Sequence, residues 1–442
     1  MRATGDGSLL GSRDAVALGV ALRAGELSCL ELAEAFLAAA DGDELRAWSA
    51  IDGDVLVTRA RALDRIGQHE RDHLPLFGLP VGVKDNFDTA DLPTAYGSPI
   101  YAGHRPPGDA EAVRRLTAAG ALIAGKTKCS EFAWMSPADT VNPLDRSRTP
   151  GGSSSGSASA VAAGTVPIAT GTQTAGSINR PASYCGVVGY KPTFQTFPRG
   201  GVKLLSRTLD TVGLLARSVR DLRLAAAALA SPSGGPGRSQ ELERPPRLAL
   251  ARTSAWGDVQ PAAQAAVEDV ALAAWDAGAC LEDLELPPGF ADLVAAQEVI
   301  QEVESATSLA GELETHGDLL SDALRAALEA GAAVPAETYA TAKRAATQLG
   351  PAIAALLAGY DGVLTPSTTG IPPLGVGFTG DPRFCRAWTL IGAPCVSVPV
   401  AWTPSRLPVG VQVVGAPFAD GRTLATAEWL LEHLAPITRN RV

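Results

Sequence analysis

The feature that most limits the fold of this chain is a series of short apolar segments separated by helical segments. Residues 76–83, 121–124, 166–170 and 186–190 form such segments. Continuous apolar strands between helices are typical of parallel or mixed sheets with helices on both faces. The sequence therefore predicts an α/β fold with a mixed or parallel sheet covered by helices on both faces.

The segments around these strands fit the same fold. Apolar residues at helical spacing predict helices over 12–40, with Ser12 and Ser28 as N-caps. Further helices are expected at 110–119, 157–163, 262–277 and 422–434 and over most of 290–360, and further strands at 247–251, 395–400 and 409–414.

Charge and composition exclude several classes of function. The chain of 442 residues has a net charge of -10 and 46% hydrophobic residues. An acidic chain gains nothing electrostatically from a phosphate backbone, so we expect no nucleic-acid ligand. No apolar run approaches the length of a membrane span, and the first residues lack the pattern of a signal peptide.

The six cysteines form no C-x-x-C pair, and none has zinc-site spacing with histidine. We expect reduced, mostly buried thiols and a cytoplasmic location. The sequence indicates no metal site and no organic cofactor.

The Gly/Ser-rich stretch at 151–159 has three interpretations. It could be a flexible linker, although strands and helices flank it closely. Residues 152–156 also match G-x-S-x-G, which would make Ser154 the nucleophile of an α/β-hydrolase esterase. That mechanism needs a downstream histidine, and only His316 and His433 follow, both in helix-like segments.

The third interpretation joins this stretch to two others. The three segments are Gly82-Val83-Lys84-Asp85-Asn86, Gly151-Gly152-Ser153-Ser154-Ser155-Gly156-Ser157-Ala158 and 171–186. Together and in this order they resemble the signature of the amidase signature family, and Ser153 and Ser177 have the family's spacing. Weaker matches extend the resemblance over about residues 28–435.

The resemblance implies a catalytic triad and an acyl-enzyme. Ser177 would attack the amide carbonyl, and Ser153, held by a cis peptide after Gly152, would pass protons between Ser177 and Lys84. Lys84 can act as a base only when its amine is neutral, which requires burial away from carboxylates. Strand alternation would point the neighbouring Asp85 away from it.

The segment before the nucleophile is the expected oxyanion hole. In the family, backbone N–H groups here, from Thr174, Ala175, Gly176 and Ser177, surround the carbonyl oxygen. Most relatives have glycine in place of Ala175, and alanine restricts φ to mostly negative values. The Thr174 hydroxyl could join the serine network.

Arg180 is the residue that bears on specificity. Many family members have arginine two positions after the nucleophile, whereas here it comes third, as in the malonamidase-type members. There the arginine receives a substrate carboxylate, which suits the two-pronged guanidinium group. Arg180 could instead only brace neighbouring loops. Cys185 is expected to be a small core residue.

The resemblance implies one α/β/α domain over 1–442, with a large mixed sheet flanked by helices on both faces. We expect a helical part at 1–70, the signature core at 75–215, a variable region that lines the pocket at about 235–385, and C-terminal strands and a helix at 387–442. The stretch 231–246 is rich in Pro, Gly, Ser and charge, and is expected to be a loop rather than a domain boundary.

The expected function is hydrolysis of a small carboxylic amide to acid and ammonia. The alternatives are a glutamine-dependent amidotransferase A-type subunit, the esterase that would use Ser154, and a non-catalytic binding protein. We expect a small-molecule amide as substrate and no membrane partner, and the malonamidase-type members imply a homodimer.

Overall fold

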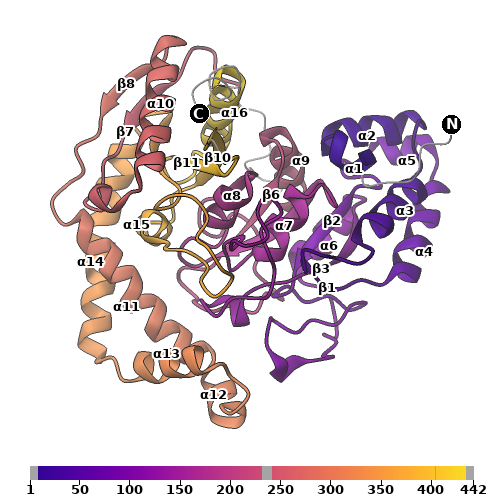
Figure 1. Cartoon of the computed structure of the whole chain (residues 1–442), viewed down its shortest axis with the longest axis horizontal. Coiled ribbons are helices and arrows are strands. Elements are labelled where there is room, and N and C mark those ends of the chain that lie inside the picture. Colours follow the sequence, from indigo (N-terminus) through magenta and orange to yellow (C-terminus); the bar gives the residue numbers. More distant parts are fainter. Residues whose placement is uncertain (1–7, 231–240, 404, 435–442) are drawn as a thin grey trace.

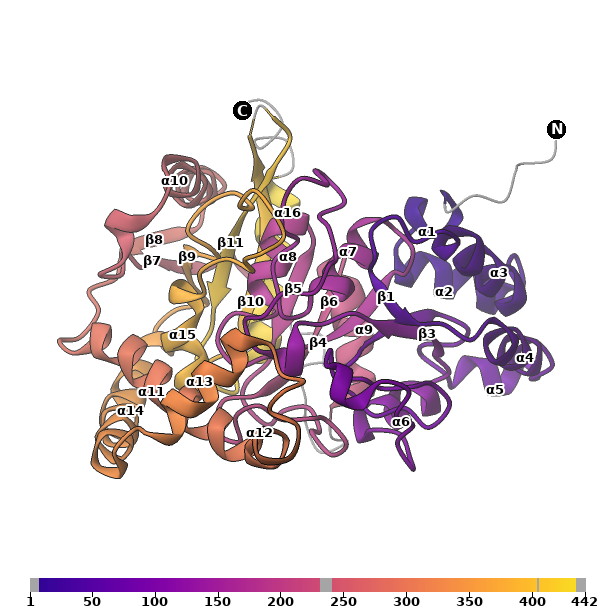
Figure 2. The same ribbon diagram turned by 60° about the horizontal axis from the view of Figure 1, so that its bottom comes forward.

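One eleven-stranded sheet crosses the whole molecule (Figures 1 and 2). The computed structural model describes residues 8–230, 241–403 and 405–434. The order of the strands is β1-β3-β2-β4-β6-β5-β10-β11-β9-β7-β8. The last two strands of the chain, β10 and β11, therefore lie inside the sheet rather than at an edge.

The strands are short, as the apolar segments predict. Their bounds are β1 Trp48–Ala50, β2 Pro80–Lys84, β3 Leu122–Thr127, β4 Ile168–Gln173, β5 Val188–Lys191, β6 Thr211–Ala216, β7 Arg247–Leu250, β8 Cys280–Asp283, β9 Gly362–Pro366, β10 Cys395–Trp402 and β11 Pro408–Val414.

The sheet is mixed, which confirms the predicted fold class. β2 runs parallel to β3 and β4, and β7 runs parallel to β8 and β9. The remaining pairs, including β10 with its neighbours β5 and β11, are antiparallel. The sequence analysis identified neither β1 and β8 at the two edges nor β6 and β9 inside the sheet.

Sixteen α-helices occur in the described part of the chain. Their bounds are α1 Ser8–Ser12, α2 Ala15–Ala24, α3 Cys29–Ala40, α4 Gly53–Asp64, α5 Gln68–Asp72, α6 Glu111–Ala118, α7 Ser155–Ala162, α8 Asn179–Cys185, α9 Val219–Leu229, α10 Pro261–Asp276, α11 Phe290–Ser308, α12 Ala310–His316, α13 Asp322–Ala332, α14 Ala336–Leu357, α15 Arg383–Leu390 and α16 Asp420–Leu434.

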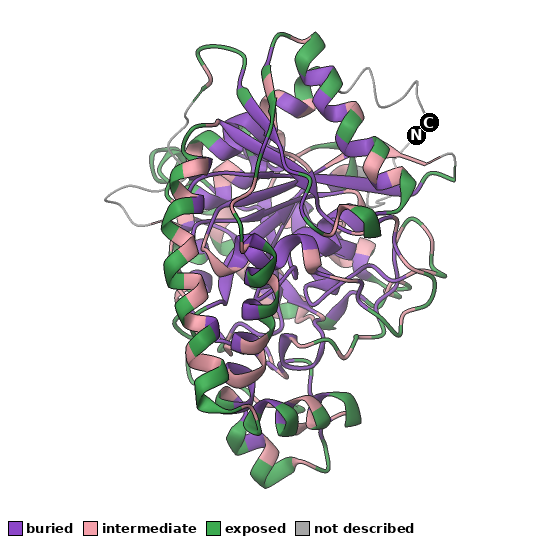
Figure 3. Cartoon of the chain, turned by 90° about the vertical axis from the view of Figure 1, so that its left-hand side faces the viewer, coloured by how far each residue is buried: buried purple, intermediate pink, exposed green. Residues whose placement is uncertain are grey.

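Helices cover both faces of the sheet. On β5, the position of Gly189 faces Ala182 of α8, whereas the hydroxyl of the next residue, Tyr190, donates to Asp420 of α16. Successive strand residues point to opposite faces, so α8 and α16 lie on opposite sides. Figure 3 shows the buried sheet between helices whose outer surfaces are exposed.

The cap of α3 agrees with the sequence and that of α2 does not. Ser28 forms a capping box with Glu31, in which each side chain binds the other residue's backbone N–H. Ser12 ends α1 instead of capping a helix, and Asp14 caps α2 by accepting from the N–H of Ala17.

Helices α11 to α14 form a helical arm that projects from one end of the sheet (Figure 1). α11 packs against α13 and α14 within the arm and against α15 beside the sheet. The arm therefore contacts the core through α11, and apolar residues of α13 and α14 are buried against the core as well. In the described residues no helix combines the length and apolar character needed to cross a bilayer.

Candidate active site

Lys84 lies at the carboxyl end of β2, where three signature segments meet. Its Nζ lies 2.9 Å from Ser153 Oγ and 2.7 Å from Thr172 Oγ1. Asn86 Nδ2 donates to the same threonine oxygen, at 3.1 Å. The structure thus brings together the predicted Lys84 and Ser153, and adds Thr172, which the sequence analysis did not identify.

A sequence signal for Thr172 exists in β4. Thr170 and Thr172 alternate along the strand and so share one face. Thr170 Oγ1 accepts the backbone N–H of Lys84 at 2.9 Å, so this pair aligns β4 with the end of β2.

Burial shifts the charge state of Lys84. The side chain is fully buried, and among the described residues no carboxylate lies within ion-pair distance of its amine. Burial lowers the pKa of Lys84 from 10.5 to about 8, while the charges of Cys129 and Asp210 act in the opposite direction. About one amine in ten is then neutral at pH 7, compared with less than one in a thousand for a free lysine.

Asp85 belongs to a separate ion pair. Its carboxylate lies 3.3 Å from the amine of Lys126 on β3, and both side chains are buried. The strand alternation that separates Asp85 from Lys84 therefore also gives Asp85 a cation of its own.

Ser153 follows Gly152 through a cis peptide bond, as expected. A side chain at Gly152 would meet Thr379 Cγ2 at 2.8 Å and Ser130 Oγ at 3.1 Å, so the glycine is required by close contact. Ser130 also donates its N–H to the carbonyl of Ser153.

Ser177 lies in the loop 174–178 that joins β4 to α8 and is 6% exposed. Its carbonyl accepts the N–H of Ser154 at 3.3 Å, so the two serine segments touch. Lys84, Ser153 and Ser177 therefore come from three adjacent segments, although their catalytic roles remain a prediction.

The backbone before Ser177 offers unused donors. In the described structure, the N–H groups of Thr174, Ala175, Gly176 and Ser177 have no hydrogen-bond acceptor, although this loop is buried. Buried N–H groups are nearly always paired. Four free donors in one loop fit the predicted oxyanion hole, and the loop places no positive φ at Ala175, so alanine is accommodated.

Thr174 does not join the serine network through its side chain. Its hydroxyl donates to the buried Asp210 Oδ1 at 2.5 Å instead. The N–H groups of Leu205 and Ser206 donate to Asp210 Oδ2. Asp210 therefore anchors the loop at Thr174. No local pattern in the sequence indicates this contact, because it joins positions 36 residues apart.

Arg180 lies in the first turn of α8 and is 3% exposed. Its Nη2 donates to the carbonyl of Gly152 at 2.7 Å and to Thr379 Oγ1 at 3.2 Å. Nε and Nη1 are buried without a hydrogen-bond partner. Arg180 therefore braces the serine loop, and it also keeps donors that no described residue uses.

Ser154 lacks the surroundings of an esterase nucleophile. It is fully buried, and its hydroxyl contacts the backbone N–H and carbonyl of Thr172, each at 3.4 Å. His433 binds the carbonyl of Trp429 within α16, and His316 ends α12.

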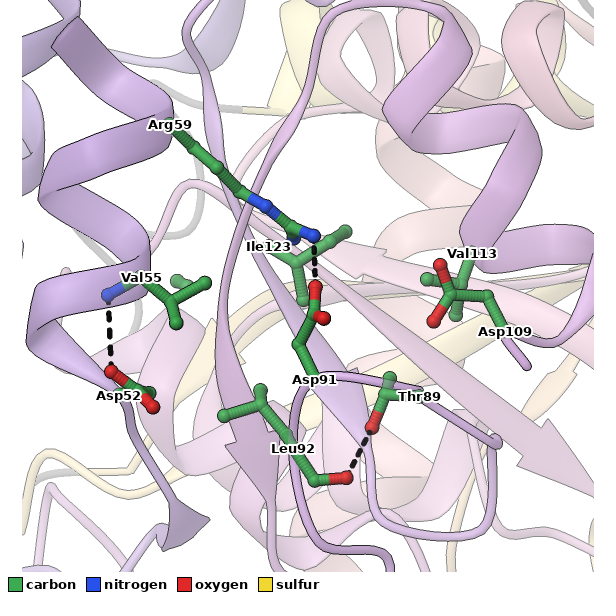
Figure 4. A pocket seen from close by; sticks show the side chains of 10 residues that line it. Asp52, Val55, Arg59, Thr89, Asp91, Leu92, Asp109, Val113 and Ile123 are labelled. Carbon is green, nitrogen blue, oxygen red and sulfur yellow. Dashed lines mark hydrogen bonds and ion pairs between the residues drawn. The ribbon is translucent and has the colours of Figure 1, made fainter. Parts of the chain in front are cut away.

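The described structure also has cavities outside this site. Figure 4 shows one of about 10 Å³ between Val55, Ile123 and Val113, whose rim carries Asp91 in an ion pair with Arg59. A larger cavity of about 600 Å³ is lined by Asp85, Cys129 and Glu131 and by the end of the helical arm at 319–321. Within the described ranges, no three His, Cys, Asp or Glu side chains are grouped to hold a metal ion.

Comparison with known proteins finds a matching family model, similar sequences and similar solved structures. The family model described as Amidase matches residues 31–424. The A-type subunit of the glutamyl-tRNA(Gln) amidotransferase of Anaeromyxobacter dehalogenans is 35% identical, over 97% of each chain.

The corresponding protein of Chloroflexus aurantiacus is 38% identical, but that match spans 60% of this chain and 59% of the relative. A solved structure described as an amidase superposes with a TM-score of 0.86 at 31% identity, over 96% of this chain and all of that one.

Proposed function

This chain belongs to the amidase family, and we propose that it hydrolyses the C–N bond of a small carboxylic amide to acid and ammonia through an acyl-Ser177 intermediate. The observation that carries the proposal is the hydrogen bond between Lys84 and Ser153. Lys84 is fully buried, and no carboxylate among the described residues lies within ion-pair distance of its amine. A lysine in that environment supplies a neutral amine, which is the base that a serine nucleophile requires.

The proposed reaction begins with proton transfer. Ser177 Oγ attacks the carbonyl carbon while its proton passes to Ser153 and the proton of Ser153 passes to Lys84. The carbonyl becomes an oxyanion that the free N–H groups of the loop 174–177 stabilise. Return of a proton through Ser153 to the amide nitrogen breaks the C–N bond and releases ammonia.

The second half repeats these transfers with water. A water molecule gives a proton to Ser153, its oxygen attacks the acyl carbon, and the ester bond to Ser177 Oγ breaks. The hydroxyl of Ser177 regains a proton and the acid leaves. All four transfers use the same relay of Ser153 and Lys84.

We further propose that Arg180 selects amides that carry a carboxylate, as in the malonamidase-type members. What supports this is the pair of buried nitrogens, Nε and Nη1, that have no partner in the described structure. An unpaired buried guanidinium donor is costly, and a substrate carboxylate would satisfy it.

Replacing Arg180 tests this specificity. The Arg180→Leu variant is expected to raise KM for carboxylated amides by at least about tenfold more than for neutral amides of the same length, because only the former lose a charge-assisted pair. Steady-state ammonia release on matched substrates measures both values. An equal change for both classes would restrict Arg180 to its structural contacts with Gly152 and Thr379.

The second candidate is a glutamine-dependent amidotransferase A-type subunit. It is favoured by relatives of that name at 35% identity over nearly the whole chain. Such a protein would use the same acyl-enzyme but would pass ammonia to a second reaction, which requires partner proteins.

Ammonia release from a panel of small amides, glutamine included, separates these functions. Turnover by the isolated chain that Ser177→Ala abolishes, strongest on carboxylated amides, supports the hydrolase. Turnover on glutamine alone that increases when a co-purifying partner is added supports the amidotransferase. For the hydrolase we also propose a cytoplasmic location and a homodimer. Sedimentation of the pure protein measures whether it is a dimer.

A further inference from the structure

The loop 174–177 is held by its carbonyl groups. The carbonyl oxygen of Thr174 accepts Gln297 Nε2 at 2.9 Å, and that of Ala175 accepts Thr389 Oγ1 at 2.8 Å. The carbonyl of Gly176 accepts the N–H of Arg180 at 2.9 Å. Three consecutive carbonyls are thus anchored by the helical arm, by α15 and by α8.

Anchoring a carbonyl also orients an N–H group. In a planar trans peptide, C=O and the following N–H point in opposite directions. Fixing the carbonyls of Thr174, Ala175 and Gly176 therefore directs the N–H groups of the next three residues to the opposite side. These are three of the four donors that have no acceptor in the described structure.

Gln297 is the anchor that comes from the helical arm. It lies in α11, 123 residues along the chain from Thr174, and is fully buried. It belongs to the region 235–385 that the sequence predicts to line the pocket, yet its side chain binds the backbone of the loop.

The orientation of the Gln297 amide is determined by its neighbours. Arg386 of α15 donates from Nη1 to Gln297 Oε1, and Arg386 in turn pairs with Glu298 at 3.2 Å. A guanidinium group can only donate, so the oxygen of the Gln297 amide must face it. Nε2 is then left to donate to Thr174 and to Gln301 Oε1, the latter at 3.0 Å.

We propose that Gln297 is a positioning residue that sets the oxyanion donors of the loop 174–177 from the helical arm, a role that rests on the proposed function of Ser177. Arg386 orients the Gln297 amide, and Gln297 fixes the peptide group between Thr174 and Ala175. The N–H of Ala175 therefore points away from Gln297, toward the proposed oxyanion site. Thr389 does the same for the N–H of Gly176.

The competing explanation is that Gln297 only attaches the arm to the core. A structural anchor would change stability, and a positioning residue would change the stabilisation of the oxyanion. Two measurements distinguish these roles. One is whether the substitution changes kcat or KM, and the other is the rate at which a fluorophosphonate labels Ser177. In that reaction Ser177 Oγ bonds to phosphorus, fluoride leaves, the proton of Ser177 passes to the relay, and the phosphoryl oxygen occupies the oxyanion site.

The test compares Gln297→Met with Gln264→Met. Methionine keeps the length and volume of glutamine but cannot donate. Gln264 of α10 is the control, because its Nε2 also donates to a backbone carbonyl, that of Trp256 at 3.0 Å, but outside the site and from a partly buried position. Removal of one oxyanion donor typically costs about 100- to 1000-fold in rate, and loss of its alignment is expected to cost about tenfold or more.

Gln297→Met should therefore lower kcat and the labelling rate at least about tenfold, with KM changed less than about threefold, whereas Gln264→Met should match the wild type. If Gln297→Met does not fold, Thr389→Val and Thr389→Ser replace it, and only the serine variant should keep the labelling rate. Labelling of Gln297→Met within about twofold of the wild type, or of Thr389→Val in the replacement test, overturns the positioning role and leaves the proposed function standing. A wild-type chain that is not labelled overturns the proposed function itself.

Discussion

Two lysines at the ends of adjacent parallel strands show how the same side chain serves two purposes. Lys84 ends β2 and Lys126 lies near the end of β3, and both are fully buried. Lys126 pairs with Asp85 and also donates to the carbonyl of Phe87 and to Thr94 Oγ1, each at 2.6 Å. Lys84 meets hydroxyl groups of Ser153 and Thr172 and has no carboxylate among the described residues.

The difference comes from one step of strand alternation. In the register of β2 with β3, Val83 lies opposite Lys126 and Lys84 lies opposite Thr127. Lys84 and Lys126 therefore point to opposite faces, and Asp85 follows the face of Lys126. Burial lowers the pKa of both lysines, but the carboxylate of Asp85 opposes this shift at Lys126, whereas Lys84 has no carboxylate beside it. Lys126 therefore stabilises the fold through its ion pair, and Lys84 is the lysine that is free to exchange a proton with Ser153.

Of the substitutions that test this difference between the two lysines, removal of Lys84 should have the largest effect. The Lys84→Met variant should lose activity by about a thousandfold or more, because the relay has no base. Its free energy of unfolding should stay equal or rise, because a buried cation without a counter-ion has been removed. Kinetics on the best amide and urea unfolding measure the two effects, and more than about a tenth of wild-type activity would exclude Lys84 as the base.

Removing Lys126 should have the opposite pattern. Lys126→Met leaves Asp85 buried and unpaired, which should lower the free energy of unfolding by about 3–5 kcal/mol, while the folded fraction keeps its activity within about tenfold. Adding Asp85→Asn should recover much of the loss. A Lys126→Met variant as stable as the wild type would show that the ion pair contributes little.

The pH dependence gives the smallest and most specific test. Because burial lowers the pKa of Lys84 to about 8, kcat/KM should rise about tenfold per pH unit below pH 8 and level off above it, as the amine loses its proton. Asp85→Asn should leave this midpoint in place. A midpoint near the 10.5 of a free amine would mean that Lys84 is not shielded as the structure indicates.

The free energy of unfolding should also depend on pH through the protonation of Lys84. Between pH 8 and 10.5 the unfolded chain holds the Lys84 proton and the folded chain does not, so the stability of the wild type relative to Lys84→Met should rise with pH in this window. Below pH 8 both states are protonated and the difference is constant. Urea unfolding of the two proteins across this range measures the change, and a difference that stays flat up to pH 10.5 would contradict the lowered pKa.

Much of the sheet was predictable because several of its strands are continuous apolar runs, and the signature segments stand out as Gly/Ser-rich or polar stretches beside those runs. The end of β2 at Lys84 and the cis bond after Gly152 were expected and are present. The edge strand β8, with its exposed Cys280 and Glu282, carries no such apolar run.

Contacts between distant segments were not predictable. The pairs Thr174–Asp210 and Thr174–Gln297 depend on how β6 and the helical arm pack, and their residues carry no local pattern. The same holds for Asp85 and Lys126, whose pairing requires the register of β2 with β3. The sequence could place Asp85 on the face away from Lys84, but it could not supply its partner.

The position of β10 and β11 within the sheet has a consequence for synthesis of the chain. β10 lies between β5 and β11, and β11 pairs with β9, so among the described residues the two halves of the sheet are joined only by β10 and β11. A ribosome exposes these residues after β1 to β9, and until then β5 and β9 each present an open edge. Chains stalled before residue 395 should therefore carry two unfinished sheets that are prone to aggregation, and these join only after β10 and β11 have emerged.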